Sequence, residues 1–546
     1  MRRTVLAVVL GVVWLAFPAG ANAARVAVGL APGADARAVA VAMAQRTGNR
    51  PESLRPIPAL LIDVPAGVSL AGIRGIRYVE PLITRHLAYT PNDPLVAKQW
   101  YLGYSGFYEP WVTLPSFETI PVAVIDSGVD ASHPDLGGRI LDAESFVGGS
   151  AKTDALGHGT FVAGLIGAEV NNGVGIAGLA PSAQLLVAKV VTKSRTIPVE
   201  AEAKAIRWAV DNGAQVINMS LGGIRDPLDP ERDTYSRLEA DAVAYAVSNG
   251  VVVVAAVGNS DQAPSSPWKY ASYPAALPHV LGVSATTDTG AIPTFSNRDS
   301  IYNDVAAPGL RILSALPRPL TSRFPACSEQ GYSSCGPEEY REAQGTSFAA
   351  PQVSAAAAVL LSLRPTLRSE QVTQLLQSTA VDLETSTGCA ACGVGRDAYS
   401  GWGRLDVAAA IAALGRRLPE RDFYETNDDL GTRAYTTYGS NRRIRATVDF
   451  WDDQDDVYAI ELGRNQPVYV GLTGTDPSVD LSLAFWLPQA RSVERVADFR
   501  YRIRTSARTG SRQYLSYKPR LGGTFYVQVR MSSPGRTHYR LTVIKG

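Results

Sequence analysis

The chain has 546 residues, of which 46% are hydrophobic and 19% are charged, and its formal net charge is +1. This length allows about three or four domains, each with a sizeable core. Because positive and negative charges balance and the sequence has no basic stripe or long run of like charge, the composition argues against a nucleic-acid-binding protein and against a charged tail.

The N-terminus has the pattern of a secretory signal peptide. Two arginines precede an apolar run over residues 4–17, and small residues follow at Ala21 and Ala23. The run is too short for a membrane span, so we expect residues 1–23 to be removed after Ala23. The mature protein is then expected outside a bacterial cell or in the periplasm, with no further segment that crosses a membrane.

Residues 24–88 have the pattern of a small α+β unit, in which a helix lies between the first two strands. The proline-rich segment 89–94 that follows predicts a domain boundary. The predicted strands are 24–34, 59–67 and 75–83, and the predicted helix is 35–48.

From about residue 120 to residue 415, apolar strands alternate with helical periods. Because continuous apolar strands are typical of a parallel sheet covered on both faces, this pattern predicts an α/β domain. Ligands of such sheets bind at the carboxyl ends of the strands, so polar residues there are candidates for a functional site. The predicted strands are 120–126, 183–191, 214–221, 250–259 and 279–286, and the predicted helices are 158–170, 199–213, 239–250 and 347–361.

The last of these helices opens with Gly-Thr-Ser, and we expect it to begin at Ser347. A serine can simply cap a buried helix, and Pro351 is close enough to the start to be tolerated. The alternative is that the Ser347 hydroxyl is held at the positive end of the helix for chemistry. The residues at the other strand and helix ends decide between these two interpretations.

Asp126 follows an apolar strand, and His158 and Ser347 stand at the starts of helices. These side chains are the orienting group, the base and the nucleophile of acyl transfer. His158 is favoured as the base, since His133 is too close to Asp126 in sequence. Asn259 follows another strand. Each residue can also be an ordinary cap or turn residue, but independent caps are not expected to fill every place of one mechanism.

The order Asp–His–Ser, with glycines around each residue, resembles the subtilisin-like serine proteases. The resemblance covers about residues 90–415 and implies a serine endopeptidase. In such an enzyme the Ser347 hydroxyl attacks the scissile carbonyl, His158 takes its proton, and Asp126 fixes the imidazole. The matching motifs are VIDSGVDASHPDL, GHGTFVAGLIG, INMSLGG, AAVGN and GTSFAAP.

The same resemblance implies that the amide of Asn259 and the N–H of Ser347 stabilise the oxyanion. Glycines after the third strand let an extended peptide pair with the chain, and small residues before Asn259 suggest a pocket for a large apolar side chain. Two insertions relative to compact family members, 224–239 and 318–344, are expected near the substrate cleft. The predicted substrate-binding residues are Ser220, Leu221, Gly222, Gly223, Ala256 and Gly258.

The stretch EVNNGVGIAGLAP, residues 169–181, resembles the loop that wraps a calcium ion in this family. Calcium takes six to eight oxygen ligands, which carbonyl groups and Asn or Asp side chains supply. An ordinary Gly/Asn turn is the alternative. The implied ligands are the side chains of Asp93, Asp135 and Asn172 and the carbonyl groups of Val170, Val174 and Ile176.

Both flanking regions also resemble parts of exported proteases. Residues 24–88 resemble the inhibitory, fold-assisting propeptides of the family, so we expect a self-processed zymogen that is cut close to Ala88–Tyr89, although a permanent small domain is the alternative. The peptidase domain is then 89–416. In residues 423–546, apolar or aromatic residues alternate with polar ones, as in the strands of a β-sandwich, and this region resembles the prepeptidase C-terminal domain.

This C-terminal region contains an acidic run that is a candidate for a second calcium site, with a solvated acidic turn as the favoured interpretation. The run consists of Asp452, Asp453, Asp455 and Asp456.

The chain has four cysteines, which in an exported protein predict two disulfides. Local pairing, Cys327 with Cys335 and Cys389 with Cys392, is preferred, and a crossed pattern stays open. A redox or zinc role of the Cys389-x-x-Cys392 motif is less favoured, because no second such motif or histidine pair accompanies it.

The expected partners are protein or peptide substrates and the chain's own propeptide, and we expect a calcium-binding monomer. Two other functions compete with this hypothesis. A catalytically silent relative could bind peptides or surfaces through its β-sandwich, but every catalytic position is filled. A nucleotide-binding α/β protein is disfavoured, since no glycine-rich phosphate loop follows the first strand and Asp126 would repel phosphate.

Overall fold

The computed structural model describes residues 24–65, 67–82, 90–111, 118–321, 339–416, 418, 422–450, 453–493 and 495–546. The predicted signal peptide, the expected cleavage point at Ala88–Tyr89, and the residues Cys327, Cys335 and Asp452 lie outside this part of the chain. The chain divides into two compact units, Met1–Ala88 and Tyr89–Gly546, which we describe one at a time.

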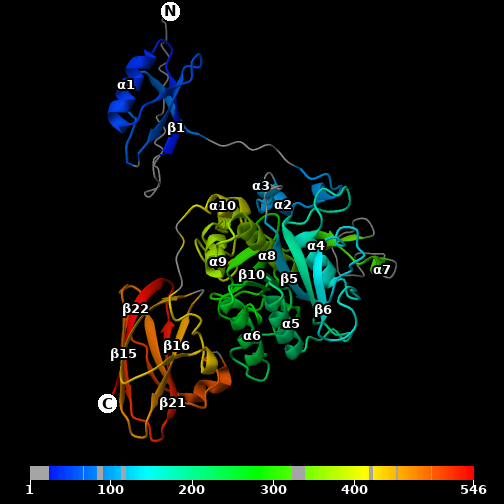
Figure 1. Ribbon diagram of the computed structural model, residues 1–546, viewed down its shortest axis with the longest axis vertical. Coiled ribbons are helices and arrows are strands. Elements are labelled where there is room, and N and C mark those ends of the chain that lie inside the picture. Colours follow the sequence, from blue (N-terminus) through cyan, green and yellow to red (C-terminus); the bar gives the residue numbers. More distant parts are fainter. Residues whose placement is uncertain are drawn as a thin grey trace, which may run out of the picture. The chain divides into compact units, whose positions relative to one another are not determined.

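In the first unit, one helix packs on a four-stranded antiparallel sheet of order β2-β3-β1-β4 (Figure 1). The helix begins after Asp35, whose carboxylate accepts hydrogen bonds from the N–H groups of Arg37 and Ala38. The two-residue strand β2 was not predicted, because it is too short to show a period. The elements are β1 Ala24–Leu30, α1 Ala36–Thr47, β2 Glu52–Ser53, β3 Ala59–Val64 and β4 Ile76–Pro81.

The second unit is built around a seven-stranded parallel sheet of order β11-β10-β9-β8-β5-β7-β6. This confirms the predicted α/β class. The edge strand β6 escaped prediction because all its residues are exposed or partly exposed and it carries no long apolar run. The strands are β5 Ile120–Asp126, β6 Ile140–Ser145, β7 Ala183–Lys189, β8 Val216–Met219, β9 Val252–Ala256, β10 Val280–Thr286 and β11 Val305–Pro308.

Helices cover both faces of this sheet (Figure 1). Along β5, Val122 and Val124 belong to a core shared with α4 and α8, whereas Ala123 and Ile125 belong to a core shared with α5 and α6. Successive residues of the strand therefore face opposite layers, and both layers are apolar. The helices are α2 Tyr101–Tyr104, α3 Tyr108–Trp111, α4 His158–Gly167, α5 Val199–Asp211, α6 Arg237–Ser248, α7 Arg318–Thr321, α8 Thr346–Leu363, α9 Ser369–Ser378 and α10 Val407–Ala412.

Within the described residues, α8 is the one helix that is long and apolar enough to cross a membrane, and 89% of it is buried inside the protein. Its apolar character therefore belongs to the core. A short antiparallel pair, β12 Ile312–Ala315 with β13 Tyr340–Ala343, lies outside the main sheet. The 3-10 helices are η1 Val96–Lys98, η3 Ser260–Gln262, η5 Thr385–Thr387, η6 Gly431–Arg433 and η7 Val496–Tyr501.

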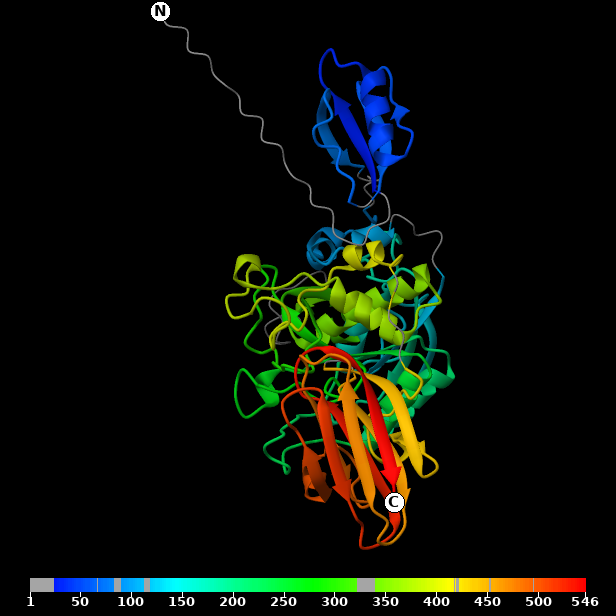
Figure 2. The same ribbon diagram turned by 90° about the vertical axis from the view of Figure 1, so that its left-hand side faces the viewer.

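The C-terminal part of this unit contains two further sheets, of order β14-β16-β21-β18-β19 and β15-β22-β17-β20. Side chains from both sheets share one core, as in a β-sandwich. In Figure 2 its strands, yellow to red, lie alongside one another. The strands are β14 Tyr435–Thr437, β15 Asn441–Asp449, β16 Asp455–Leu462, β17 Val468–Gly474, β18 Leu481–Trp486, β19 Arg502–Ser506, β20 Arg512–Tyr517, β21 Gly523–Met531 and β22 Arg536–Lys545.

Candidate active site

Asp126 is the last residue of β5, at the carboxyl end of an interior strand, and its side chain is buried. Both of its carboxylate oxygens lie 2.9 Å from Nδ1 of His158. The N–H of Ser127 donates a further hydrogen bond to Oδ1 at 2.7 Å. The carboxylate is therefore fixed against one ring nitrogen, and Nε2 of His158 makes no hydrogen bond with the described part of the chain.

His158 is the first residue of α4, and the next residue must be a glycine. A Cβ atom on Gly159 would lie 2.1 Å from the carbonyl oxygen of Gly128 and 3.2 Å from Oδ1 of Asp126. Without a side chain, the start of α4 can approach the end of β5 closely enough for the His158 ring to reach the carboxylate.

Asp154, which the sequence did not single out, organises the turn before α4. Its Oδ1 accepts hydrogen bonds from the hydroxyl of Ser127 and from the N–H of Gly157, both at 2.9 Å. Its Oδ2 accepts from the N–H of Thr160, also at 2.9 Å. The available signal was an aspartate shortly before a helix, which is too common at helix starts to identify a site.

The helix that carries Ser347 begins one residue earlier than predicted, at Thr346, with Gly345 as its N-cap. Ser347 therefore lies in the first turn, where backbone N–H groups have no intrahelical acceptor. No described group accepts a hydrogen bond from its N–H.

Pro351 explains a second contact of Ser347. A proline has no N–H to donate to the carbonyl four residues earlier, which here is that of Ser347. The hydroxyl of Ser220 fills this place and donates to the Ser347 carbonyl at 2.7 Å, while the Ser347 hydroxyl donates to the Ser220 carbonyl at 3.2 Å. The helix start and the segment after β8 are therefore joined by two reciprocal hydrogen bonds.

Asn259 follows β9, and its side-chain oxygen accepts hydrogen bonds from the N–H of Thr346 at 3.0 Å and from its hydroxyl at 3.1 Å. These contacts assign the orientation of the amide. Within the described residues, Nδ2 of Asn259 has no hydrogen-bond acceptor. The site thus contains two donors without acceptors, this amide and the N–H of Ser347.

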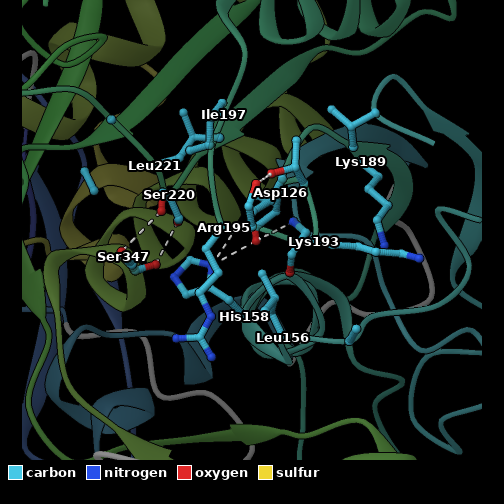
Figure 3. A pocket seen from close by; sticks show the side chains of 18 of the residues that line it. Asp126, Leu156, His158, Lys189, Lys193, Arg195, Ile197, Ser220, Leu221 and Ser347 are labelled. Carbon is cyan, nitrogen blue, oxygen red and sulfur yellow. Dashed lines mark hydrogen bonds and ion pairs between the residues drawn. The ribbon is translucent and has the colours of Figure 1, made fainter. Parts of the chain in front are cut away.

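These side chains meet at one cavity of about 1330 Å³. In the view of Figure 3, the ring of His158 lies between Ser347 and Asp126. Gly223 is the one predicted substrate residue that does not line the cavity, because its N–H and carbonyl pair with Tyr273, both at 2.9 Å. The predicted residues that do line it are Asp126, His158, Ser220, Leu221, Gly222, Ala256, Gly258, Asn259 and Ser347.

The lining also contains polar residues that the sequence did not reveal. Ser272 and Asn297 lie beside Gly258, and Lys189, Lys193 and Arg195 also line the cavity (Figure 3). They come from strands and loops without a recognisable motif, so only the fold brings them to the cavity.

The negative charge of Asp126 raises the pKa of the His158 imidazole. Burial lowers the pKa of His158, but the charge of Asp126 and its hydrogen bond to the ring raise it more. The pKa of His158 therefore lies above its ordinary value of 6.5. The side chain is 34% exposed, so the ring is open to the cavity on one side.

The residues of the predicted calcium loop also converge. Asp93 accepts hydrogen bonds from the N–H groups of Asn171 and Asn172, at 2.9 and 3.2 Å. Asp135 accepts from Nδ2 of Asn172 at 2.8 Å and from the N–H of Ile176 at 3.0 Å. Both carboxylates are buried, and this burial raises the pKa of each.

The backbone of the same loop fits a cation. No hydrogen bond of the described residues ends on the carbonyl oxygens of Val170, Val174 or Ile176. Gly175, with φ of 46°, keeps the loop close to Asp135, because a Cβ there would lie 2.4 Å from its Oδ2. Buried carboxylates beside carbonyl groups without donors are the ligand set that calcium prefers.

Cys389 and Cys392 form a disulfide. Their sulfur atoms are therefore bonded to each other, so a crossed pattern that includes either of them and a zinc site at this motif are wrong. Cys327 and Cys335 lie outside the described residues, and their pairing stays a prediction.

A carboxylate at a strand end, an imidazole and a hydroxyl at two helix starts, and two donors without acceptors form the arrangement that serine hydrolases use for acyl transfer. The chain belongs to the subtilase family, whose model (Peptidase_S8: Subtilase family) matches residues 118–403.

Known proteins are similar to part of the chain. Subtilisin E of Bacillus subtilis (strain 168) is 37% identical over 293 residues, which span 53% of this chain and 65% of that protein. Subtilisin of Bacillus pumilus is also 37% identical over 293 residues, with 90% of that protein covered. A solved protease structure from Pseudoalteromonas arctica PAMC 21717 has a TM-score of 0.48 and 28% identity, over 60% of this chain and 100% of that one.

Proposed function

We propose that this chain is a secreted serine endopeptidase that hydrolyses peptide bonds through Asp126, His158 and Ser347. The observation that carries the proposal is the pair of 2.9 Å contacts between His158 Nδ1 and the Asp126 carboxylate, in the cavity that Ser347 also lines. Membership of the subtilase family supports it.

In the proposed mechanism, the Ser347 hydroxyl attacks the carbonyl carbon of the substrate while Nε2 of His158 accepts its proton. Asp126 holds the proton on Nδ1 and stabilises the imidazolium, which then protonates the leaving amine. In the free protein the Ser347 hydroxyl donates to the Ser220 carbonyl. A substrate N–H that pairs with this carbonyl would compete for it and release the hydroxyl toward His158.

Labelling with a tagged fluorophosphonate tests this proposal. The purified, processed protein should be labelled at Ser347, and the Ser347→Ala variant should not be labelled, because only an activated serine reacts with this probe. If the wild type stays unlabelled with calcium present and the N-terminal segment removed, a catalytically silent binding protein is the better interpretation.

The proposal includes maturation. Residues 1–23 act as the signal peptide, residues 24–88 as an intramolecular inhibitor that is removed near Tyr89, and 423–546 as a C-terminal accessory domain of a monomeric enzyme. N-terminal sequencing of wild type and Ser347→Ala tests self-processing. The wild type should begin near Tyr89 and the variant should keep the segment, whereas equal processing of both would require another protease.

Asn259→Ala is expected to lower kcat by about 10²- to 10³-fold with little change in KM, since its amide would meet charge that develops only in the transition state. Asn259→Asp is the matched variant, because it keeps an oxygen for Thr346 but removes the donor. Both variants should lose activity alike in steady-state kinetics. Full activity of Asn259→Asp would mean that Asn259 only accepts hydrogen bonds from Thr346 at the helix start and does not stabilise the oxyanion.

We further propose that calcium binds at Asp93, Asp135, Asn172 and the carbonyl groups of Val170, Val174 and Ile176, where it would stabilise the loop without entering the reaction. In the Ser347→Ala background, Asp135→Asn is expected to bind one calcium ion fewer in equilibrium dialysis. Its unfolding temperature with calcium should fall by about 5 °C or more. The exposed Asp142→Asn should match the parent, and unchanged binding by Asp135→Asn would contradict this site.

A further inference from the structure

Three carboxylates of the β-sandwich meet in its interior beside the peptidase domain. One oxygen each from Glu425, Asp453 and Asp456 lie within 4.8 Å of one another. Among the described residues, neither Asp453 nor Asp456 forms an ion pair with an arginine or lysine. Within the same part of the chain, Glu425 forms one ion pair, with Nε2 of His279 at 3.9 Å. Three like charges therefore face one another without an arginine or lysine beside them.

Most oxygens of this cluster also lack a hydrogen-bond donor among the described residues. Both oxygens of Glu425, Oδ1 of Asp453 and Oδ1 of Asp456 are buried and accept no hydrogen bond from this part of the chain. The Glu425 side chain is 3% exposed and Asp456 is fully buried. Leaving a buried acceptor unpaired is costly, and leaving several together is costlier, so these oxygens point to a ligand with positive charge.

The cluster corrects the interpretation of the acidic run. A solvated turn is wrong for Asp455 and Asp456, since both are buried. Asp455 is not part of this cluster, because its carboxylate forms an ion pair with Arg530 at 3.2 Å and accepts a hydrogen bond from Gln528 at 2.6 Å. The third carboxylate of the cluster, Glu425, is distant in sequence from the run and only the fold brings it close.

The surrounding contacts hold the ligands in place. The hydroxyl of Tyr539 donates to Oδ2 of Asp456, and the hydroxyl groups of Tyr458 and Tyr539 lie 2.6 Å apart. Without a cation, carboxylates whose oxygens lie within 4.8 Å of one another repel each other.

One neighbour of the cluster comes from the peptidase domain. His279, directly before β10, has its Nε2 3.0 Å from Oδ1 of Asp428. The adjacent Asp429 accepts a hydrogen bond from the hydroxyl of Tyr235, also of the peptidase domain, at 3.4 Å. The short segment 425–429 thus carries a carboxylate of the cluster and two of the contacts between the β-sandwich and the peptidase domain.

We propose that a calcium ion binds between Glu425, Asp453 and Asp456, and that its binding fixes the segment that docks the β-sandwich on His279 of the peptidase domain. An all-carboxylate set favours calcium over zinc. His279 faces Asp428, so it acts as a docking partner. Metal binding at this cluster can be measured on a chain that lacks the Ser347 nucleophile. The test of this site therefore does not depend on catalytic activity.

The test uses the full-length Ser347→Ala protein, which prevents self-digestion. Asp456→Asn should bind one calcium ion fewer in equilibrium dialysis, and Asp455→Asn, the matched control one residue away, should bind as many as the parent. Asp135→Asn with Asp456→Asn should lose two. Equal binding by the Asp456→Asn variant and the parent would overturn the site, whether or not the enzyme proves to be a protease.

Thermal unfolding separates a metal ligand from a structural aspartate. Without calcium, Asp456→Asn should be more stable than the parent, because it removes repulsion; with calcium it should be less stable, because it removes a ligand. A shift in the same direction under both conditions would contradict the proposal.

Hydrogen exchange tests the link between the domains. Calcium should slow amide exchange around His279 in the parent. The His279→Ala variant should keep the bound calcium but lose this protection. Calcium-dependent protection that persists in His279→Ala would overturn the docking role.

Discussion

The Ser347→Ala variant is expected to lose activity on the order of 10⁶-fold in kcat, the magnitude established for subtilisin itself. The reason is geometric as well as chemical. Ser347 lies in the first turn of α8, where its N–H has no acceptor among the described residues and its carbonyl accepts a hydrogen bond from the Ser220 hydroxyl at 2.7 Å. Alanine preserves these backbone contacts, so the loss should reflect the missing hydroxyl alone.

Two comparisons make this result specific. Ser362→Ala, at the far end of the same helix, removes a hydroxyl that donates only to the carbonyl of Val359. It should keep activity within a few-fold. Wild-type and Ser347→Ala proteins should have matching circular dichroism and unfolding temperatures. Substantial peptidase activity of a correctly folded Ser347→Ala protein would show that another residue is the nucleophile.

Asp126→Asn is expected to lower kcat by about 10⁴-fold while leaving the fold intact. An amide in this place no longer stabilises the imidazolium, and it can present its NH₂ group to Nδ1 and so favour the wrong tautomer. Steady-state kinetics on a peptide substrate measures the loss.

The same variant should change the pH profile. The proposed base is active when His158 is neutral, so activity falls as the pH drops through its pKa. Asp126 raises this pKa above 6.5. Removing the charge lowers the pKa, and the acidic limb of kcat/KM should therefore move to lower pH.

Asp261→Asn provides the charge control for this shift. Asp261 lines the same cavity and is exposed, and its carboxylate forms no hydrogen bond or ion pair with His158. The acidic limb of this variant should stay in place. An equal shift in both variants would mean that the net charge of the cavity, and not the contact with Asp126, sets the pKa of His158.

The strands and helices that carry the site residues could be predicted well, because apolar residues recur in them with a regular period. Strand 120–126 was predicted with the bounds of β5, and Asp126 stands at its end. Apolar runs between polar ends are local signals, so the alternation of strands and helices and the positions of Asp126, His158 and Ser347 could be predicted without the fold.

What escaped prediction depends on contacts between distant segments. Asp154 accepts hydrogen bonds from both Ser127 and Thr160. The backbone of Gly223 pairs with that of Tyr273, and Gly223 does not line the cavity. Likewise, Glu425 and Asp456 become neighbours only when the β-sandwich is formed. None of these residues has a local pattern that separates it from an ordinary turn or strand residue.

The helix that carries Ser347 has one further consequence. Nearly every side chain of α8 is buried, including the whole stretch from Ala355 to Leu360, and the helix contacts strands β5, β8, β9, β10 and β11. The Ser347 hydroxyl is therefore carried by a helix that is packed into the core, and the helix start cannot move far without disturbing that packing. Loss of activity on heating should accordingly coincide with melting of the whole domain, with no softer stage in which the site fails first.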